Sequence, residues 1–362
     1  MLKQQKIFFD FLRFCIGSAK EIPDTLNEAD WEELYGIAQK QCLVGVLFDG
    51  IKKLPAEHVG MEKELLLHWM AESQMLEKAN VRLNDAAIQV SEWFRKKGFR
   101  TSILKGQGNA LMYPNPYSRT PGDIDIWVEG GDKRVISFVR SISPHEKACY
   151  HHIEFPSYKG VEVEVHYRPS FLLCFWHNRK LQKYYERVKE EQFSHCVMLG
   201  EQGEIAIPTV EFNLIFQLTH IYAHLMNEGI GLRQLLDYYF VLSMLSVSCE
   251  MLTSLQKKLK KLGLWKFAGG IMYIMQEVFG MPASRLIVPP NEKYGKFVLN
   301  EVLEAGNFGK HDARNRFGRS QLGHNLQRVY RDMRLVRYFP AEALSEPFFR
   351  VWHIFWRMKN KI

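Results

Sequence analysis

The chain has 362 residues, 46% of them hydrophobic, and a formal net charge of +8 from 48 basic and 40 acidic side chains. No segment reaches the roughly 20 uncharged apolar residues of a membrane-spanning helix, so we expect a cytoplasmic protein without a membrane partner. The positive charge suits an anionic ligand such as a nucleotide or a nucleic acid. The six cysteines are scattered without a CxxC pair, which argues against a zinc site or a disulfide framework.

Residues 1–97 form the first predicted region, which is helical. Charged residues interrupt the apolar start of the chain, and its spacing is helical, so we interpret it as an amphipathic helix rather than a signal peptide. Asp30 can cap a helix that begins at Trp31. A long helix is expected over residues 61–97, with Gly98 ending it.

Residues 98–206 change to an α+β pattern. The alternation of apolar and polar residues predicts a helix and four short strands, at 132–142 and at 99–104, 123–128, 151–155 and 161–167. Helical spacing returns over residues 207–362. The predicted fold class is therefore α+β, with a central mixed β-sheet and its helices flanked by N- and C-terminal helical regions.

The segment GDIDIWV at residues 122–128 carries the strongest chemical signal. Alternate side chains of a strand share a face, so Asp123 and Asp125 project together. Two adjacent carboxylates repel each other unless a cation lies between them, and Mg²⁺ combines such carboxylates with phosphate oxygens. The alternative is a solvated strand face, because a bare DxD occurs often by chance.

A second strand, VEVEVHY at residues 161–167, has Glu162, Glu164 and His166 on one face. A third carboxylate beside the two aspartates would complete a two-metal centre, which activates a hydroxyl and stabilises leaving pyrophosphate. An amphipathic edge strand with a polar outer face would give the same alternation.

The segment that follows the first strand suits a phosphate group. Lys105 and Gly106 end that strand, and a helix could begin at Gln107, whose backbone N–H groups would favour phosphate. The P-loop spacing is absent, and Lys105 could equally be a surface lysine. Arg119, in the loop before the two aspartates, could pair with a phosphate or with an acidic neighbour.

In chain order these motifs resemble the nucleotidyltransferase superfamily that includes DNA polymerase β. The resemblance is closer to an uncharacterised bacterial branch, in which an LKG motif replaces the usual Gly-Ser pair. The residues that carry it are Leu104-Lys105-Gly106, Arg119, Asp123-Ile124-Asp125 and Glu164-Val165-His166. Flanking helical segments also look similar, so the resemblance spans most of the chain.

The resemblance implies a Mg²⁺- or Mn²⁺-dependent enzyme that moves a nucleoside monophosphate from a nucleoside triphosphate to an acceptor hydroxyl and releases pyrophosphate. Asp123, Asp125 and Glu164 would be the catalytic metal ligands, with Glu162 the alternative to Glu164. The residues that would bind the nucleotide are Lys105, Gly106, Gln107 and Arg119. The acceptor stays open: a small molecule, RNA or a protein hydroxyl.

Two alternatives remain beside the enzyme. The missing Gly-Ser pair is compatible with a nucleotide- or partner-binding protein on the same fold that has lost catalysis. The C-terminal arginines could make a nucleic-acid-binding protein, although we interpret them as a solvated basic face. They are Arg314, Arg316, Arg319, Arg328, Arg331, Arg334 and Arg337.

Two further pairs lie one helical turn apart. His220 and His224 lack the glutamate of an HExxH zinc motif, so we interpret them as core or interface histidines. Arg233 and Asp237 are predicted to form a structural ion pair.

Overall fold

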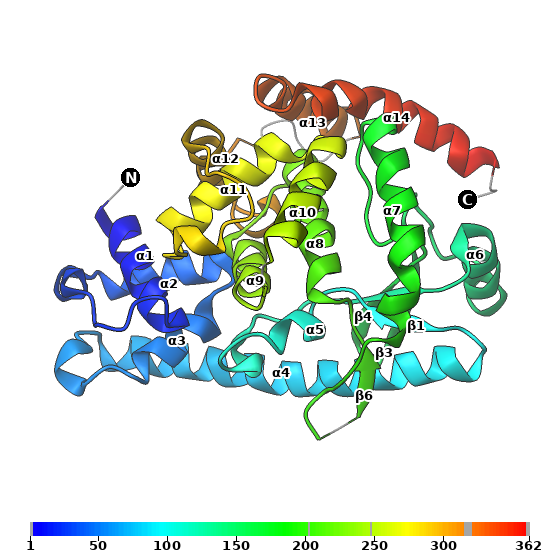
Figure 1. Ribbon diagram of the computed structural model, residues 1–362. Helices are drawn as coiled ribbons and strands as arrows, with labels where there is room; N and C mark the ends of the chain where they lie inside the picture. Colours follow the sequence, from blue (N-terminus) through cyan, green and yellow to red (C-terminus); the bar gives the residue numbers. More distant parts are fainter. Residues whose placement is uncertain (1–2, 202, 247, 315–320, 360–362) are drawn as a thin grey trace.

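The computed structural model describes residues 3–201, 203–246, 248–314 and 321–359 (Figure 1). A four-stranded mixed sheet lies among many helices, so the predicted α+β class is confirmed. Its strand order is β1-β2-β4-β3, with strands β1 (Thr101–Ile103), β2 (Ile124–Val128), β3 (His152–Tyr158) and β4 (Val161–His166). The pair β2 and β4 is parallel, and both outer strands run antiparallel to their neighbours.

The strand register determines where the acids lie. Asp125 on β2 is directly opposite Glu164 on β4. The alternate residues of both strands face a buried core, in which Ile126 and Val165 have no exposed surface. Side chains of the helices α4 (Lys63–Lys96) and α6 (Gly131–Ile142) belong to the same core.

The helix α4 connects two parts of the molecule and runs along one whole side of it (Figure 1). Its second half contributes Leu83, Ala87 and Phe94 to the core of the sheet. Its first half packs against α3 (Val44–Ile51), and Trp69 is fully buried there. Gly98 follows this helix with a positive φ of 79°, as expected of a residue that ends it.

The N-terminal helices α1 (Lys3–Ile16) and α2 (Trp31–Gln41) pack as predicted. Asp30 accepts a hydrogen bond from the backbone N–H of Glu33, at 3.1 Å, and so caps α2. Buried side chains of both helices share one continuous hydrophobic core with the C-terminal helices. The predicted boundaries after residues 97 and 206 stay a prediction.

The remaining helices are mostly C-terminal to the sheet. A short two-stranded sheet, β5 (Cys196–Met198) and β6 (Glu204–Ala206), precedes most of them. None of the helices in the described ranges is both apolar and long enough to cross a membrane. The helices are α5 (Gln107–Ala110), α7 (Phe175–Ser194), α8 (Val210–Asn227), α9 (Leu232–Ser243), α10 (Cys249–Lys261), α11 (Trp265–Glu277), α12 (Glu292–Ala305), α13 (Gln321–Leu335) and α14 (Pro340–Lys359).

Candidate active site

Three acidic side chains converge at the start of β2 and the middle of β4. Asp123, Asp125 and Glu164 offer carboxylate oxygens that lie within 4.8 Å of one another. Asp125 is buried, whereas the other two are half-buried. Glu162 lies on the same cavity wall but belongs to no group of three ligands among the described residues. The geometry therefore favours Glu164 over Glu162 as the third carboxylate.

Two cations already contact this cluster. Lys105 Nζ lies 3.0 Å from Asp125 Oδ2, and His166 Nε2 lies 2.9 Å from Asp125 Oδ1. The same His166 nitrogen lies 3.3 Å from Glu164 Oε2. Both oxygens of Asp125 are thus paired, and the cluster attracts positive charge before any ligand binds.

These contacts shift the pKa values of the titratable side chains in the site. Burial disfavours the charged forms, but the ion pairs outweigh it in each case. The pKa of Asp125 is lowered because Lys105 and His166 face it, and the pKa of Glu164 falls to about 2, chiefly through His166. The pKa of His166 rises to about 9 through Asp125 and Glu164. At neutral pH both carboxylates and the imidazole are therefore charged.

The segment after β1 has the predicted turn and a short helix, α5. Gly106 adopts a φ of +57°, which favours glycine at this position. Gln107 is buried, and its amide donates to the side chain of Asn84 and to the backbone oxygen of Asn80, both on α4. Its side chain is not part of the cavity wall, so its position argues against the predicted contact with a nucleotide.

Arg119 holds the loop that leads to the acids. Its Nε and Nη2 donate to the two oxygens of Asp237 on α9, each at 2.8 Å, and Asp237 also accepts from the hydroxyl of Tyr113. The ion pair predicted between Arg233 and Asp237 is therefore wrong, because Arg119 takes both carboxylate oxygens. Arg233 donates instead to the backbone oxygen of Thr120. This position favours the ion-pair interpretation of Arg119 over a phosphate contact.

A cavity of about 1180 Å³ opens in front of the three acids, between the sheet and the C-terminal helices. Apart from the three acids and Lys105, which contacts them, six lysine or arginine side chains and three acidic side chains line it. The basic ones are Arg82, Lys159, Arg233, Lys310, Arg328 and Arg350. Its volume and its basic lining suit a polyanionic small molecule.

Residues 27–280 match the family described as uncharacterised nucleotidyltransferase. The chain belongs to this family. The predicted resemblance to the nucleotidyltransferase superfamily is thereby confirmed, and the matched residues include the three acids and the LKG motif.

Comparison with solved structures gives a weaker similarity. An antigenic nucleotidyltransferase-like protein from Paracoccidioides brasiliensis aligns with 61% of this chain and 97% of its own, at 11% identity and a TM-score of 0.34. No curated protein has a sequence that matches this one significantly.

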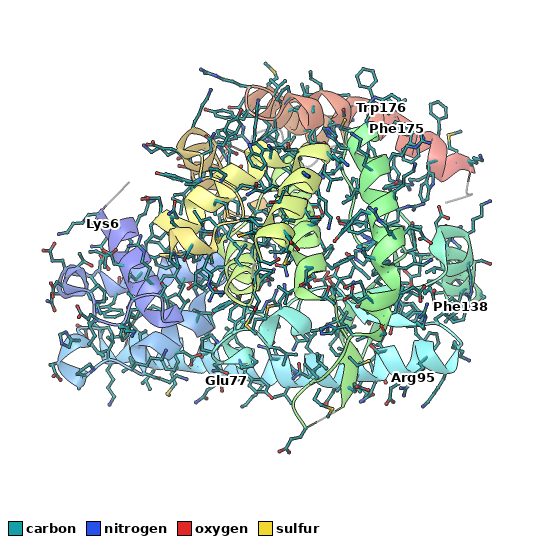
Figure 2. The ribbon with its side chains drawn as sticks, viewed as in Figure 1. Lys6, Glu77, Arg95, Phe138, Phe175 and Trp176 are labelled. Atoms are coloured by element: carbon teal, nitrogen blue, oxygen red, sulfur yellow. The ribbon has the colours of Figure 1, made fainter. Side chains whose placement is uncertain are left out.

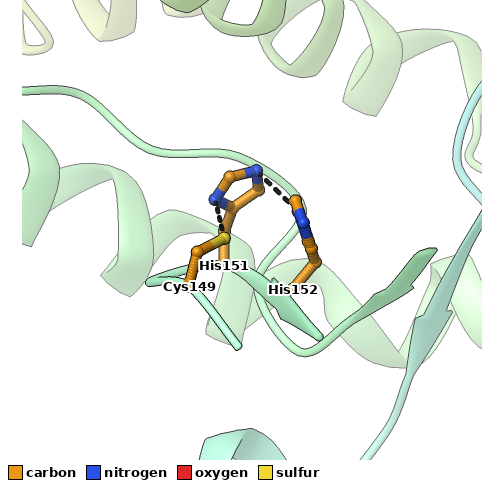
Figure 3. Close-up of side chains that lie close together, drawn as sticks. All are labelled: Cys149, His151 and His152. Atoms are coloured by element: carbon orange, nitrogen blue, oxygen red, sulfur yellow. Dashed lines mark hydrogen bonds between the residues drawn. The ribbon is translucent and has the colours of Figure 1, made fainter. Parts of the chain in front are cut away.

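This member of the nucleotidyltransferase family carries a second donor group that the sequence analysis missed. Cys149, His151 and His152 lie together (Figure 3), and they line the same cavity as the carboxylates. Cys149 Sγ lies 3.3 Å from His151 Nδ1, and His151 Nε2 lies 3.1 Å from His152 Nδ1. Burial lowers the pKa of both histidines, to about 4 for His152, so both are neutral at pH 7. The CxHH pattern at residues 149–152 is the feature of the sequence from which this donor group could have been predicted.

The predicted histidine pair of the C-terminal region also lines the cavity. His220 and His224 are half-buried on α8, with ring centroids 4.3 Å apart. His224 Nδ1 lies 3.5 Å from Glu228 Oε2. Neither histidine belongs to a group of three metal ligands among the described residues.

The C-terminal arginines do not form the uniform solvated face that we expected. Arg314 pairs with Asp312 and Glu301, and Arg331 is buried. Arg328 lines the cavity, and Arg334 lies 3.5 Å from Glu301. The tertiary fold turns several of these cations inward. Arg316 and Arg319 lie outside the described residues.

Proposed function

We propose that the protein transfers a nucleoside monophosphate from a nucleoside triphosphate to an acceptor hydroxyl, with pyrophosphate as the second product. The observation that carries the proposal is the convergence of three carboxylates within 4.8 Å on the wall of a large cavity. Membership of the nucleotidyltransferase family supports the same reaction class. We further propose that it acts in the cytoplasm, a reducing compartment that suits its six free cysteines.

The donor atoms suit a hard divalent cation. Asp123, Asp125 and Glu164 would hold Mg²⁺ or Mn²⁺, since both ions prefer carboxylate and phosphate oxygens. Such an ion neutralises the phosphate charge and favours ionisation of the attacking hydroxyl. The lining of the site supports this fit, because the three carboxylates offer ligand oxygens within 4.8 Å of one another.

The transfer proceeds directly from the nucleotide to the acceptor, without a covalent enzyme intermediate. The acceptor oxygen forms a bond to the α-phosphorus, and the bond from that phosphorus to the bridging oxygen of the β-phosphate breaks. The hydroxyl proton leaves through Glu164, a half-buried carboxylate on the cavity wall, and passes to solvent. Lys105 pairs with Asp125, and it would be free to pair with the departing phosphates if a cation held that carboxylate instead.

The test combines binding with turnover. Calorimetric titration with the magnesium complexes of ATP, GTP, CTP and UTP should show saturable binding of at least one of them. Incubation of that labelled nucleotide with cell extract should give a labelled product and pyrophosphate. Asp123→Asn, a change at a half-buried acid, should abolish both products while the protein stays folded. Equal labelling by wild type and variant would refute the proposal.

One observation favours a second function, nucleotide binding without transfer. Asp125 is only 2% exposed, and both of its oxygens are already paired inside the protein. If these ion pairs persist, the nucleotide would bind without a catalytic ion. Saturable nucleotide binding that does not depend on Mg²⁺, together with no pyrophosphate release, would identify this function.

A further inference from the structure

A second cavity, of about 720 Å³, adjoins the first one. It lies between α7 and α14 and beside the segment that follows β4, and most of its aromatic lining comes from these elements. Four residues line both cavities, so the two share a wall. They are Tyr150, Pro169, Leu173 and Phe349.

The shared wall is aromatic and firmly held. The ring of Tyr150 lies edge-on to Phe349 and Trp352, at centroid distances of 5.6 and 5.4 Å. The guanidinium of Arg168 also lies over this ring, 4.5 Å from its centroid. The Tyr150 hydroxyl accepts a hydrogen bond of 2.9 Å from Asn178 on α7. The pocket is therefore formed before a ligand arrives, as small-molecule sites usually are.

On α14, beside this pocket, acidic side chains are buried and an aromatic side chain is exposed. Its acids Glu342 and Glu346 are buried, and Glu342 accepts from the backbone N–H of Leu173 at 2.6 Å. Its aromatic residue Phe348, which lines the pocket, is 79% exposed. Phe175, at the start of α7, is also exposed at the pocket and projects outward near α14 (Figure 2). Exposed apolar clusters of this kind mark binding sites.

The pocket also carries charge on one side. Arg179 and Lys183 lie one helical turn apart on α7 and line the pocket. The two acids of the pocket lining pair with other cations, Asp132 with Arg168 and Glu186 with Lys189. A ligand with an apolar body and an anionic group would meet both features of the pocket.

We infer that the acceptor of the nucleotidyl group is an amphiphilic small molecule, whose apolar body fills this pocket while its hydroxyl reaches over the shared wall toward Glu164. The inference rests on the proposed function. The argument is that the two cavities lie side by side across this wall: an acceptor must approach the acids from a space next to the nucleotide, and the adjoining space has many aromatic side chains in its lining. Burial of an apolar body there would contribute to binding, because it removes apolar surface from water.

The first test asks whether the pocket binds an apolar anion. The probe is 1-anilinonaphthalene-8-sulfonate, followed by its fluorescence, and we expect saturable binding with one site per chain. Ser345→Trp should fill the pocket and weaken binding by about tenfold or more. The matched control is Leu344→Trp, on the same helix but outside the pocket, which should change the affinity little. Equal binding by both variants would overturn the inference, since the dye would then lie on the exposed helix face.

The second test identifies the acceptor by its solubility. Cell extract is separated into butanol-soluble and water-soluble fractions, and each is incubated with the protein and the labelled nucleotide. We expect label in butanol-soluble compounds, lost with Ser345→Trp and kept with Leu344→Trp, while nucleotide binding stays the same in both. Label in water-soluble compounds alone would refute the amphiphilic acceptor and leave the transferase intact. No transfer to either fraction would refute the transferase itself, and the inference with it.

Discussion

Asp125 illustrates how single residues define the site. It is buried, yet it keeps its charge because Lys105 and His166 each occupy one of its oxygens. His166 also contacts Glu164, so the imidazole links the two strands that carry the acids. A buried network of this kind is costly when one member is removed, because the remaining charges lose their partners.

Glu164→Gln should lower the transfer rate by about 100-fold or more, since a metal-bound carboxylate contributes several kcal/mol to the transition state. The matched control is Glu162→Gln, because Glu162 lies on the same strand and the same cavity wall. We expect the control to stay within about threefold of wild type in steady-state transfer of the labelled nucleotide. A larger loss in Glu162→Gln than in Glu164→Gln would exchange their roles.

The raised pKa of His166 predicts how stability depends on pH. Its pKa is about 9 in the folded protein, where Asp125 and Glu164 face it, against about 6.5 in the unfolded chain. The stabilising contribution is therefore complete below pH 6.5 and is lost as the pH rises through 9. We expect the free energy of unfolding in EDTA to fall by on the order of 3 kcal/mol over this window.

The control for this pH dependence is His166→Gln. Chemical denaturation of the variant, followed by tryptophan fluorescence, should give a much flatter profile between pH 6.5 and 9. The neighbouring His151 and His152 have lowered pKa values in the folded protein, so they contribute to the profiles of wild type and variant alike and drop out of the comparison. Parallel profiles for wild type and variant would show that His166 is not the group responsible.

At the scale of elements, the loop before β2 is held from two sides. Asn80 on α4 donates to the backbone oxygens of Tyr117 and Arg119, each at 2.8 Å. The Arg119 side chain reaches α9 through Asp237. These contacts position Asp123, which directly precedes the strand. Arg119 therefore acts on the acids through the loop and α9.

Arg119→Met should destabilise the protein by about 3–5 kcal/mol, because it leaves the buried carboxylate of Asp237 without its cation. Thermal or chemical unfolding measures this loss, and Glu292→Gln in an exposed pair with Lys296 should change nothing measurable. Calorimetry on the folded variant should find a weaker affinity for the magnesium–nucleotide complex only alongside this loss of stability, because Arg119 acts on Asp123 through the loop. A lower affinity at unchanged stability would instead restore Arg119 as a nucleotide ligand.

At the scale of the whole molecule, the N-terminal and C-terminal helical regions pack against each other. The helices at the N-terminal end and those after residue 207 bury their side chains in one continuous core. The sheet has a separate core, and the second half of α4 supplies part of it. One 34-residue helix, α4, contributes side chains to both cores and so connects the sheet that carries the acids to the helical part of the molecule.

A fragment of residues 98–206 should fail to fold by itself. It lacks the α4 side chains that cover the sheet, among them Leu83, Ala87 and Phe94, and each large apolar side chain contributes about 1.5–3 kcal/mol when buried. Circular dichroism during heating should show no cooperative transition. The matched control is a fragment of residues 63–206, which retains α4 and should be more helical and more resistant to proteolysis. A cooperative transition in the shorter fragment would contradict this prediction.

The sequence by itself determined the local elements and the chemistry of the acids. Periods of 3.6 and 2 identify helices and strands, so α4, β2 and β4 lie close to their predicted ranges. Strand alternation also predicts that Asp123 and Asp125 share a face, and the structure brings Glu164 to them. These features depend on neighbours a few residues away, which any single sequence contains.

Only the tertiary structure decided which distant groups meet. Arg119 and Asp237 are separated by 118 residues in the sequence. The helical i, i+4 spacing therefore predicted an ion pair between Asp237 and Arg233 instead. Gln107 turns toward α4, and the acids of α14 turn inward, because partners on other elements satisfy them there. Burial and long-range pairing depend on how the elements pack, and local spacing carries no information about that packing.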